Sequence, residues 1–198
     1  MKTKALIGYG GHARETMAQM QLELPCFVDD EYVSDNTLPI SKFDPIKYHA
    51  MIAIGDPQIR SKIQKRLPPN TQYFTFIHPS AQIMNSSVEI GKGSFIGANT
   101  ILTTSIVLGN HSILNRGNHI SHDCIIGDYF SAMPNSIISG EVKIGSRVYL
   151  GANSSIKEKI TICSDVILGM NSGATKDINQ PGTYCNTPAQ KIKIYTKN

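Results

Sequence analysis

An aliphatic residue occupies every sixth position from residue 90 to residue 174 of this chain. The fifteen positions are Ile90, Ile96, Leu102, Leu108, Leu114, Ile120, Ile126, Ala132, Ile138, Ile144, Leu150, Ile156, Ile162, Leu168 and Ala174. An α-helix has a period of 3.6 residues and a β-strand a period of 2, so neither explains this spacing. A solenoid of hexapeptides does, because each hexapeptide forms one side of a triangular coil and three complete a turn. The pattern predicts five coils.

A second inward row lies two residues before positions of the first row. It includes Val88, Ser94, Thr100, Cys124, Val142, Val148, Ser154 and Val166. Small and aliphatic side chains of this kind fill a narrow interior. We therefore predict that residues 79–198 form a left-handed parallel β-helix of hexapeptide repeats with a C-terminal tail. The alternative, an all-β sandwich, would have to keep this spacing by coincidence.

Residues 1–78 carry a different pattern, in which short apolar runs alternate with helical segments. Strands are predicted at residues 4–10, 25–30, 49–56 and 71–79, and helices at residues 12–24 and 57–67. This alternation is typical of a small, Rossmann-like parallel α/β sheet. Ligands of such sheets bind beyond the carboxyl ends of the strands, which here carry Gly8 to His12, Asp29–Asp30 and Gly55–Asp56.

The first strand ends in a glycine-rich turn, "GYGGHA", that matches the G-x-G-x-x-G/A phosphate-binding pattern. Glycines at such a turn let backbone N–H groups approach a phosphate at a helix N-terminus. Asp29 follows at the offset where a carboxylate accepts from a ribose or a base. A dinucleotide fold needs two such halves and the four strands supply one, so we expect a mononucleotide, attached to a sugar. The alternative is that the glycines only make a tight turn.

The segment "NRGNHISHDC" concentrates groups capable of acid–base chemistry. In the six-residue register Cys124 points inward as an inert thiol, whereas His122 and Asp123 fall at outward or corner positions. A neutral imidazole beside a carboxylate is a common general base. Two alternatives remain open: a surface histidine without a role, and a zinc site built from His111, His119 and His122 as in carbonic anhydrase-like coils.

Composition narrows the range of partners. The net charge is only +4, from 19 lysines and arginines against 15 aspartates and glutamates, and the basic residues are scattered, so a nucleic-acid partner is not expected. The four cysteines form no C-x-x-C pair, which suits a reducing compartment. No apolar stretch reaches the length needed to span a bilayer, and the N-terminal apolar run is shorter than that of a signal peptide. We expect a cytoplasmic protein without membrane insertion.

Together these motifs resemble one family along nearly the whole chain: the bacterial nucleotide-amino-sugar N-acetyltransferases of the bacillosamine type, with their sialic acid O-acetyltransferase relatives. The resemblance rests on "GYGGHARE", "FVDD", "AIGDPQIRSKI" and "HPSA", followed by "ISHDCIIGD", "SGEVKIG", "YLGANSSI" and "GTYCNTPAQKI". The chain departs from the family pattern at Ser131, where many members have histidine, and at Asn186, where they have glycine. Tyr9 is also bulkier than the usual small residue.

The resemblance implies a set of site residues. The nucleotide-sugar site would comprise Gly8, Tyr9, Gly10, Gly11, His12, Asp29, Asp30 and Gly55. His122 would be the general base and Asp123 its orienting partner. Acetyl-CoA would contact Ser131, Gly140, Ala152 and Met170, in clefts between the subunits of a homotrimer. No metal is implied.

The implied reaction is N-acetylation of a UDP- or dTDP-linked 4-amino-4,6-dideoxy sugar. The sugar amine would attack the thioester directly, His122 would take its proton, and a backbone N–H such as that of Gly140 would stabilise the oxyanion. The competing hypotheses are O-acetylation of sialic acid or CMP-sialic acid, a zinc hydratase, and a non-catalytic scaffold that binds a nucleotide sugar.

Overall fold

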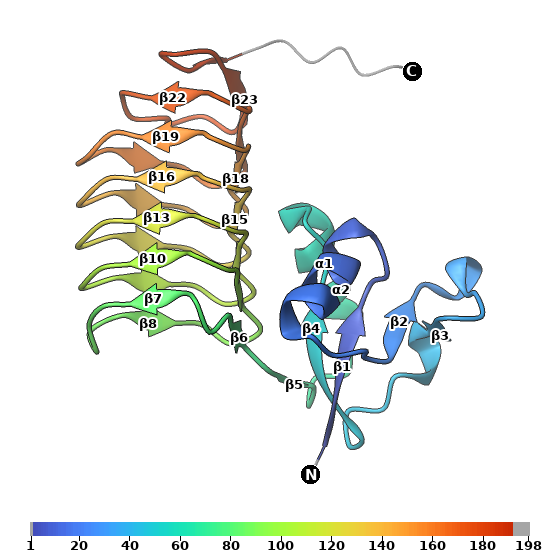
Figure 1. Ribbon diagram of the computed structural model, residues 1–198. Coiled ribbons are helices and arrows are strands. Elements are labelled where there is room, and N and C mark those ends of the chain that lie inside the picture. The colour runs from blue at the N-terminus through green and yellow to red at the C-terminus, as the bar shows by residue number, and fades with distance from the viewer. Residues whose placement is uncertain (1, 192–198) are drawn as a thin grey trace, which may run out of the picture.

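The computed structural model describes residues 2–191 and contains two domains that pack against each other (Figure 1). The N-terminal domain is a five-stranded sheet in the order β3-β2-β1-β4-β5, and all its pairings are parallel. Its elements are β1 (Thr3–Ile7), α1 (Gly11–Met20), β2 (Cys26–Val28), β3 (Leu38–Pro39), β4 (Tyr48–Ile52), α2 (Pro57–Arg66) and β5 (Gln72–Tyr73), with short 3-10 helices at Asp30–Tyr32 and Ile40–Lys42. The parallel α/β sheet is confirmed, and β3 is an edge strand that the sequence pattern did not predict.

The second helix begins where its sequence indicates. The Asp56 carboxylate accepts a hydrogen bond from the backbone N–H of Ile59 at 2.9 Å, and Pro57 occupies the first turn. An N-cap aspartate followed by proline satisfies one free N–H and needs no partner for another. This local chemistry fixes the chain direction directly after β4, where Gly55 lies.

The second domain is the predicted left-handed β-helix, with three parallel sheets that we call the first, second and third faces. The first face contains β6 (Phe76–Ile77), β9 (Phe95–Ile96), β12 (Ile113–Leu114), β15 (Ser131–Ala132), β18 (Tyr149–Leu150), β21 (Val166–Leu168) and β23 (Gly182–Cys185), with antiparallel β24 (Gln190–Lys191). The second contains β7 (Gln82–Ile83), β10 (Ile101–Leu102), β13 (His119–Ile120), β16 (Ile137–Ile138), β19 (Ser155–Ile156) and β22 (Gly173–Ala174). The third contains β8 (Glu89–Ile90), β11 (Val107–Leu108), β14 (Ile125–Ile126), β17 (Lys143–Ile144) and β20 (Thr161–Ile162).

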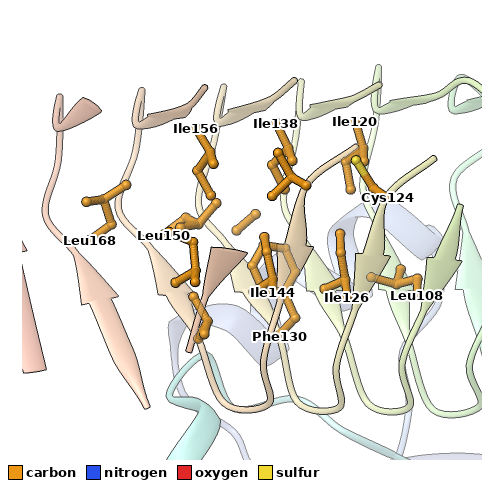
Figure 2. Packing of buried hydrophobic residues seen from close by; sticks show 14 of the residues in the cluster. Leu108, Ile120, Cys124, Ile126, Phe130, Ile138, Ile144, Leu150, Ile156 and Leu168 are labelled. Carbon is orange, nitrogen blue, oxygen red and sulfur yellow. The ribbon is translucent and has the colours of Figure 1, made fainter. Parts of the chain in front are cut away.

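The six-residue row forms the interior of this β-helix. Side chains from successive coils, among them Ile120, Ile138 and Ile156, point into the same core (Figure 2). Every member from Ile96 to Ala174 is buried, whereas Ile90, near the open end, is half-buried. The predicted second row is also buried from Ser94 onward.

The β-helix begins earlier than the sequence pattern suggests. β6 and β7 pair with β9 and β10, so they belong to the first coil. The segment predicted as the fourth strand of the α/β sheet is divided: β5 joins that sheet, and β6, before the predicted boundary at residue 78, joins the coil. The first coil escapes the pattern because Ile83 and Ile90 are seven residues apart, which breaks the register.

The corners of the coil also follow a period of six. A residue with a left-handed backbone conformation recurs at each corner, with φ between 54° and 64° from Asn99 to Asn171 wherever the residue is not glycine. Asparagine and aspartate tolerate this conformation better than most residues, which accounts for their frequency there. Asp123 is one of these corner residues, with φ of 59°.

The N-terminal domain covers the lower part of the first face (Figure 1). Phe95 and Ile113, which point outward from that face, form one hydrophobic cluster with residues of the N-terminal sheet and of α1. Since hydrophobic burial is the main favourable term in domain association, this shared cluster holds the two domains together. Neither α1 nor α2 is long and apolar enough to cross a membrane, and this holds for every helix within residues 2–191.

Candidate functional site

His122 and Asp123 lie at the corner between β13 and β14. The Nδ1 atom of His122 is 2.7 Å from Oδ2 of Asp123, and about half of each side chain is exposed. When Nδ1–H donates to the carboxylate, Nε2 is left with a free lone pair that can accept a proton. The left-handed conformation of Asp123 turns the chain at this point and so sets the carboxylate beside the ring.

Gly140 lies on the next coil, directly against the His122 imidazole. A Cβ atom at Gly140 would be 2.6 Å from both Cε1 and Nε2 of His122. The backbone N–H of Glu141 donates to the carbonyl of His122 at 2.9 Å, so the two coils are tied together at this corner. A glycine is therefore required for the imidazole to lie where it does.

Cys124 follows this pair and is fully buried, as predicted. Its side chain points into the core beside Ile120 and Ile126 (Figure 2). Burial raises the pKa of the Cys124 thiol, so at neutral pH it is protonated and a poor nucleophile. Among His122, Asp123 and Cys124, this leaves His122 as the candidate proton acceptor at this corner.

The three histidines of the zinc hypothesis are not brought together. His111 is at the corner between β11 and β12, buried under the N-terminal domain, where it stacks on Tyr129 with ring centroids 5.4 Å apart. His119 is exposed on the second face, and His122 is at a different corner. Within residues 2–191 no cluster of three or more His, Cys, Asp or Glu side chains could hold a metal ion.

A pocket of about 440 Å³ lies at the carboxyl ends of β1 and β2. Gly8, Tyr9, Gly10 and Asp29 from the predicted nucleotide site line it. Gly8 has φ of 107°, and a Cβ there would be 2.9 Å from the Ile54 side chain. The turn thus requires glycine for its backbone shape, independently of any ligand. Gly11 is the first residue of α1 and is not among the pocket-lining residues.

Two further charged groups lie beside this pocket. Arg66 pairs with Asp29 at 2.5 Å, and both line an adjoining cavity of about 730 Å³. Asp30, also in that cavity, accepts a hydrogen bond from the backbone N–H of Ser41. Hydrogen bonding by the Ser41 side chain, and secondly by its backbone, lowers the pKa of the Asp30 carboxyl. Asp30 therefore holds the loop after β3, whereas Asp29 faces both cavities.

His12 does not line the pocket at the carboxyl ends of β1 and β2. Its ring packs edge-on against Phe95 of the β-helix, with centroids 5.2 Å apart, and its Nε2 atom is buried without a hydrogen-bond partner. Burial, together with the nearby Arg60 charge, lowers the pKa of His12 to about 4, so the ring is neutral at pH 7. It faces the domain interface because it lies on the side of α1 that packs against the coil.

Ser131, expected to contact acetyl-CoA, is also in the domain interface. Its side chain is completely buried; its hydroxyl donates to the carbonyl of Gly55 at 2.8 Å and accepts from Arg60 at 2.9 Å. Ser131 points outward in the repeat, but the N-terminal domain covers this part of the first face, so the side chain is not exposed to solvent. No surface of Ser131 is left for a cofactor, and this expectation is corrected.

Arg60 of α2, which sequence reasoning missed, is the centre of this interface. It is fully buried, and its guanidinium donates to backbone carbonyls of both domains: those of Ile54, Gly55, His111, Tyr129 and Phe130, at 2.6–3.1 Å. Burial lowers its pKa to about 9, which still leaves it charged at neutral pH. No signal in the sequence distinguishes Arg60 from the other basic residues of α2.

Ala152 and Met170 lie one coil apart along the corner between the first and second faces. Met170 is strongly exposed, and the carbonyl of Ala152 accepts a hydrogen bond from the next coil, at Asn171. His122 and Gly140 lie along the corner between the second and third faces. The residues implied for acetyl-CoA binding are therefore on two different corners of one chain.

Three family matches cover much of the sequence. Residues 5–67 match the PglD N-terminal domain, residues 87–117 the hexapeptide repeat of succinyl-transferase, and residues 123–158 the bacterial transferase hexapeptide (six repeats). No curated protein sequence matches the chain. The matches agree with the two domains described above and with the resemblance noted in the sequence.

Solved structures share the whole architecture. PerB from Caulobacter crescentus, in complex with CoA and GDP-perosamine, has a TM-score of 0.86 at 24% identity, covering 98% of both chains. WeeI from Acinetobacter baumannii has a TM-score of 0.86 at 26% identity, covering 97% of this chain and 100% of its own. The acetyltransferase domain of PglB from Neisseria gonorrhoeae, in complex with acetyl coenzyme A, has a TM-score of 0.83 at 25% identity, with the same coverage as WeeI. The predicted combination of domains is confirmed.

Proposed function

We propose that this chain, which belongs to the hexapeptide-repeat acyltransferases with a PglD-type N-terminal domain, transfers an acetyl group from acetyl-CoA to the amine of a nucleotide-linked sugar. The observation that carries the proposal is the His122–Asp123 pair, a half-exposed imidazole oriented by a carboxylate. The nucleotide would bind at Gly8, Gly10 and Asp29. CoA and GDP-perosamine bound to PerB support both substrate classes.

The reaction needs only one proton carrier. The neutral amine attacks the thioester carbonyl and forms the C–N bond, while His122 Nε2 takes the proton that the amine loses. Asp123 stabilises the imidazolium through Nδ1–H. The tetrahedral intermediate then expels the CoA thiolate, which receives the proton from His122. The Gly140 backbone N–H is our candidate for the oxyanion donor.

The proposed assembly is a homotrimer with active sites between subunits. One chain carries the Ala152–Met170 corner and the His122–Gly140 corner on different edges of its coil. One acetyl-CoA molecule that contacts both sets therefore requires two chains. The proposed nucleotide pocket lies in the N-terminal domain, which covers the first face of the coil. His122 lies on the edge of the coil opposite that face.

Thiol release from acetyl-CoA tests the proposal. The acceptors are UDP-, dTDP- and GDP-linked 4-amino-4,6-dideoxy sugars, with sialic acid and CMP-sialic acid as O-acetylation substrates. We expect turnover on a UDP- or dTDP-linked amino sugar, with kcat lowered about 10²- to 10⁴-fold in His122→Ala. His119→Ala, which removes an exposed histidine of the same coil, is the matched control. Turnover only on sialic acids, or full activity of His122→Ala, would overturn the proposal.

A further inference from the structure

The buried guanidinium of Arg60 joins the loop after β4 to the coil. Its Nη1 atom donates to that loop, at the carbonyls of Ile54 (2.6 Å) and Gly55 (3.1 Å). Its Nε and Nη2 atoms donate to the coil at 2.8–3.0 Å, to the carbonyls of His111, Tyr129 and Phe130 and to the hydroxyl of Ser131. We propose that Arg60 is a positioning residue, which holds this loop, and with it one wall of the nucleotide pocket, at a place fixed by the coil. The assignment rests on the proposed function, which puts a nucleotide in the pocket at the carboxyl ends of β1 and β2.

The loop shapes the pocket through Ile54. This side chain lines the pocket together with Gly8 and Gly10. It also packs closely on the glycine turn, since a Cβ atom at Gly8 would be 2.9 Å from Cγ1 of Ile54 and 3.2 Å from the carbonyl oxygen of Ala53. A shift of the loop toward β1 would therefore displace the turn, and a shift away from β1 would widen the pocket. The hydrogen bonds of Arg60 to the loop thus set the width of the pocket at the turn.

The coil holds the same loop through Ser131. The Ser131 hydroxyl donates to the carbonyl of Gly55 at 2.8 Å and accepts from Arg60 at 2.9 Å. On its other side the loop continues into Asp56, whose carboxylate caps α2 and whose carbonyl accepts from the backbone N–H of Arg60 at 3.0 Å. The loop is therefore fixed between α2 and the coil, and it cannot move without breaking contacts to one of them.

The chemistry of Arg60 fits a role in orientation. Within residues 2–191 no carboxylate forms an ion pair with this buried charge. Burial of a charge costs free energy that its hydrogen bonds have to offset, so an apolar contact could join the domains equally well. A guanidinium provides in addition a planar set of five N–H donors with fixed directions. Those donors reach backbone carbonyls of both domains, so Arg60 fixes the direction of one backbone segment relative to the other.

Nucleotide affinity tests the assignment. Arg60→Lys keeps the charge and loses the planar fork, so we expect the Kd for UDP, dTDP or GDP, whichever the wild type binds, to rise about tenfold. The KM for the nucleotide sugar should rise in parallel, whereas kcat and the KM for acetyl-CoA should stay within about twofold. Ser131→Ala removes only the donor of the coil to Gly55 and should raise the same Kd about threefold.

The matched control is Tyr129→Phe. It removes another hydrogen bond between the coil and α2, the 3.3 Å bond from the Tyr129 hydroxyl to Gln64, without touching the loop. An unchanged nucleotide Kd in folded Arg60→Lys would overturn the assignment, and so would an equal rise in Tyr129→Phe, because docking in general would then set the affinity. If circular dichroism shows that Arg60→Lys is unfolded, the comparison of Ser131→Ala with Tyr129→Phe decides in the same way.

A wild type that binds none of the three nucleotides would contradict the proposed function, and amide exchange would then decide the role of Arg60 alone. The N–H groups of Gly8 and Ala53 donate to the carbonyls of Phe27 and Ile7, on either side of the turn and the loop. Faster exchange of these two amides in Arg60→Lys or Ser131→Ala, and not in Tyr129→Phe, supports the positioning role. Wild-type protection of both amides, or faster exchange throughout both domains, overturns it.

Discussion

Outward-facing residues of the β-helix have opposite environments on its different faces. On the first face Phe95, Ile113 and Ser131 are buried, because the N-terminal domain covers them. On the third face Val107 and Ile125 occupy the same repeat position and remain exposed. The N-terminal domain therefore docks on the first face. The second and third faces, which it leaves uncovered, meet at the corner that carries His122. A repeat position sets which way a side chain points, but only the surroundings decide what it contacts.

The largest effect on stability is expected from a substitution of Arg60, at the interface between the N-terminal domain and the first face. Arg60→Met would leave several buried carbonyls of both domains without a donor, which we expect to destabilise the protein by about 4 kcal/mol. Urea unfolding measures the change. Arg66→Met, at the exposed end of the same helix, should cost less than about 1 kcal/mol. Equal effects of the two substitutions would show that the buried interface is not the source of the stability.

At the corner between the second and third faces, which carries His122, the most informative substitution is Gly140→Ala. The added methyl group would overlap the His122 ring and displace it, and a shift of about 1 Å can cost roughly a hundredfold in rate. We expect kcat to fall about a hundredfold, with little change in the KM for the nucleotide sugar. Gly173→Ala, where the nearest group is the flexible side chain of Thr187, is the control. Wild-type kcat in Gly140→Ala would argue against His122 as the base.

Acid should weaken the interface between the two domains. His12, on α1 of the N-terminal domain, and His111, on the coil, are both buried at the interface between the two domains, and burial lowers their pKa values to about 4. An unfolded histidine has a pKa of about 6.5, so the unfolded state binds more protons between these values. Each histidine's contribution is complete above pH 6.5 and is lost as pH falls toward 4, at about 1–2 kcal/mol by pH 5. Urea midpoints at pH 7.5 and 5 measure it.

The matched variants for this prediction are His111→Gln and His119→Gln. His111→Gln should flatten the pH dependence because it removes one buried histidine, whereas exposed His119→Gln should leave it unchanged. Identical stability of the wild type at pH 7.5 and 5 would contradict the buried, neutral state of the two rings.

The coil was predictable from the sequence because its signal is local and repeated. Each inward position is set by its own hexapeptide, and His122, Asp123 and Cys124 could be placed from the register alone. The first coil was hidden by a single extra residue between Ile83 and Ile90. The left-handed corner row could have been found from its asparagines and aspartates, since they are separated by multiples of six residues: Asn99, Asp123, Asn135, Asn153, Asp165 and Asn171.

Domain docking could not be predicted in the same way, because it depends on surfaces far apart in the chain. Ser131 has the pattern of an exposed position, and only the distant Gly55 and Arg60 make it a buried one. His12 lies in a turn that matches a phosphate-binding sequence pattern, yet its side chain packs on Phe95, which is contributed by the coil. Neither contact has a local sequence signal.

The smallest effect on the folded chain is expected on the third face, from the double substitution Val107→Asp and Ile125→Asp. Both side chains are exposed, so the fold should lose less than about 0.5 kcal/mol per site. In the proposed trimer this face adjoins the His122 corner, and two charges placed in an interface would oppose association. We expect light scattering to show a trimer for the wild type and a smaller species for the variant, with thiol release reduced in parallel. Lys143→Asp, on the same face but already charged, is the control. A variant that keeps the wild-type mass and activity would place the intersubunit contact elsewhere and would leave the third face open in the assembly as it is in the single chain.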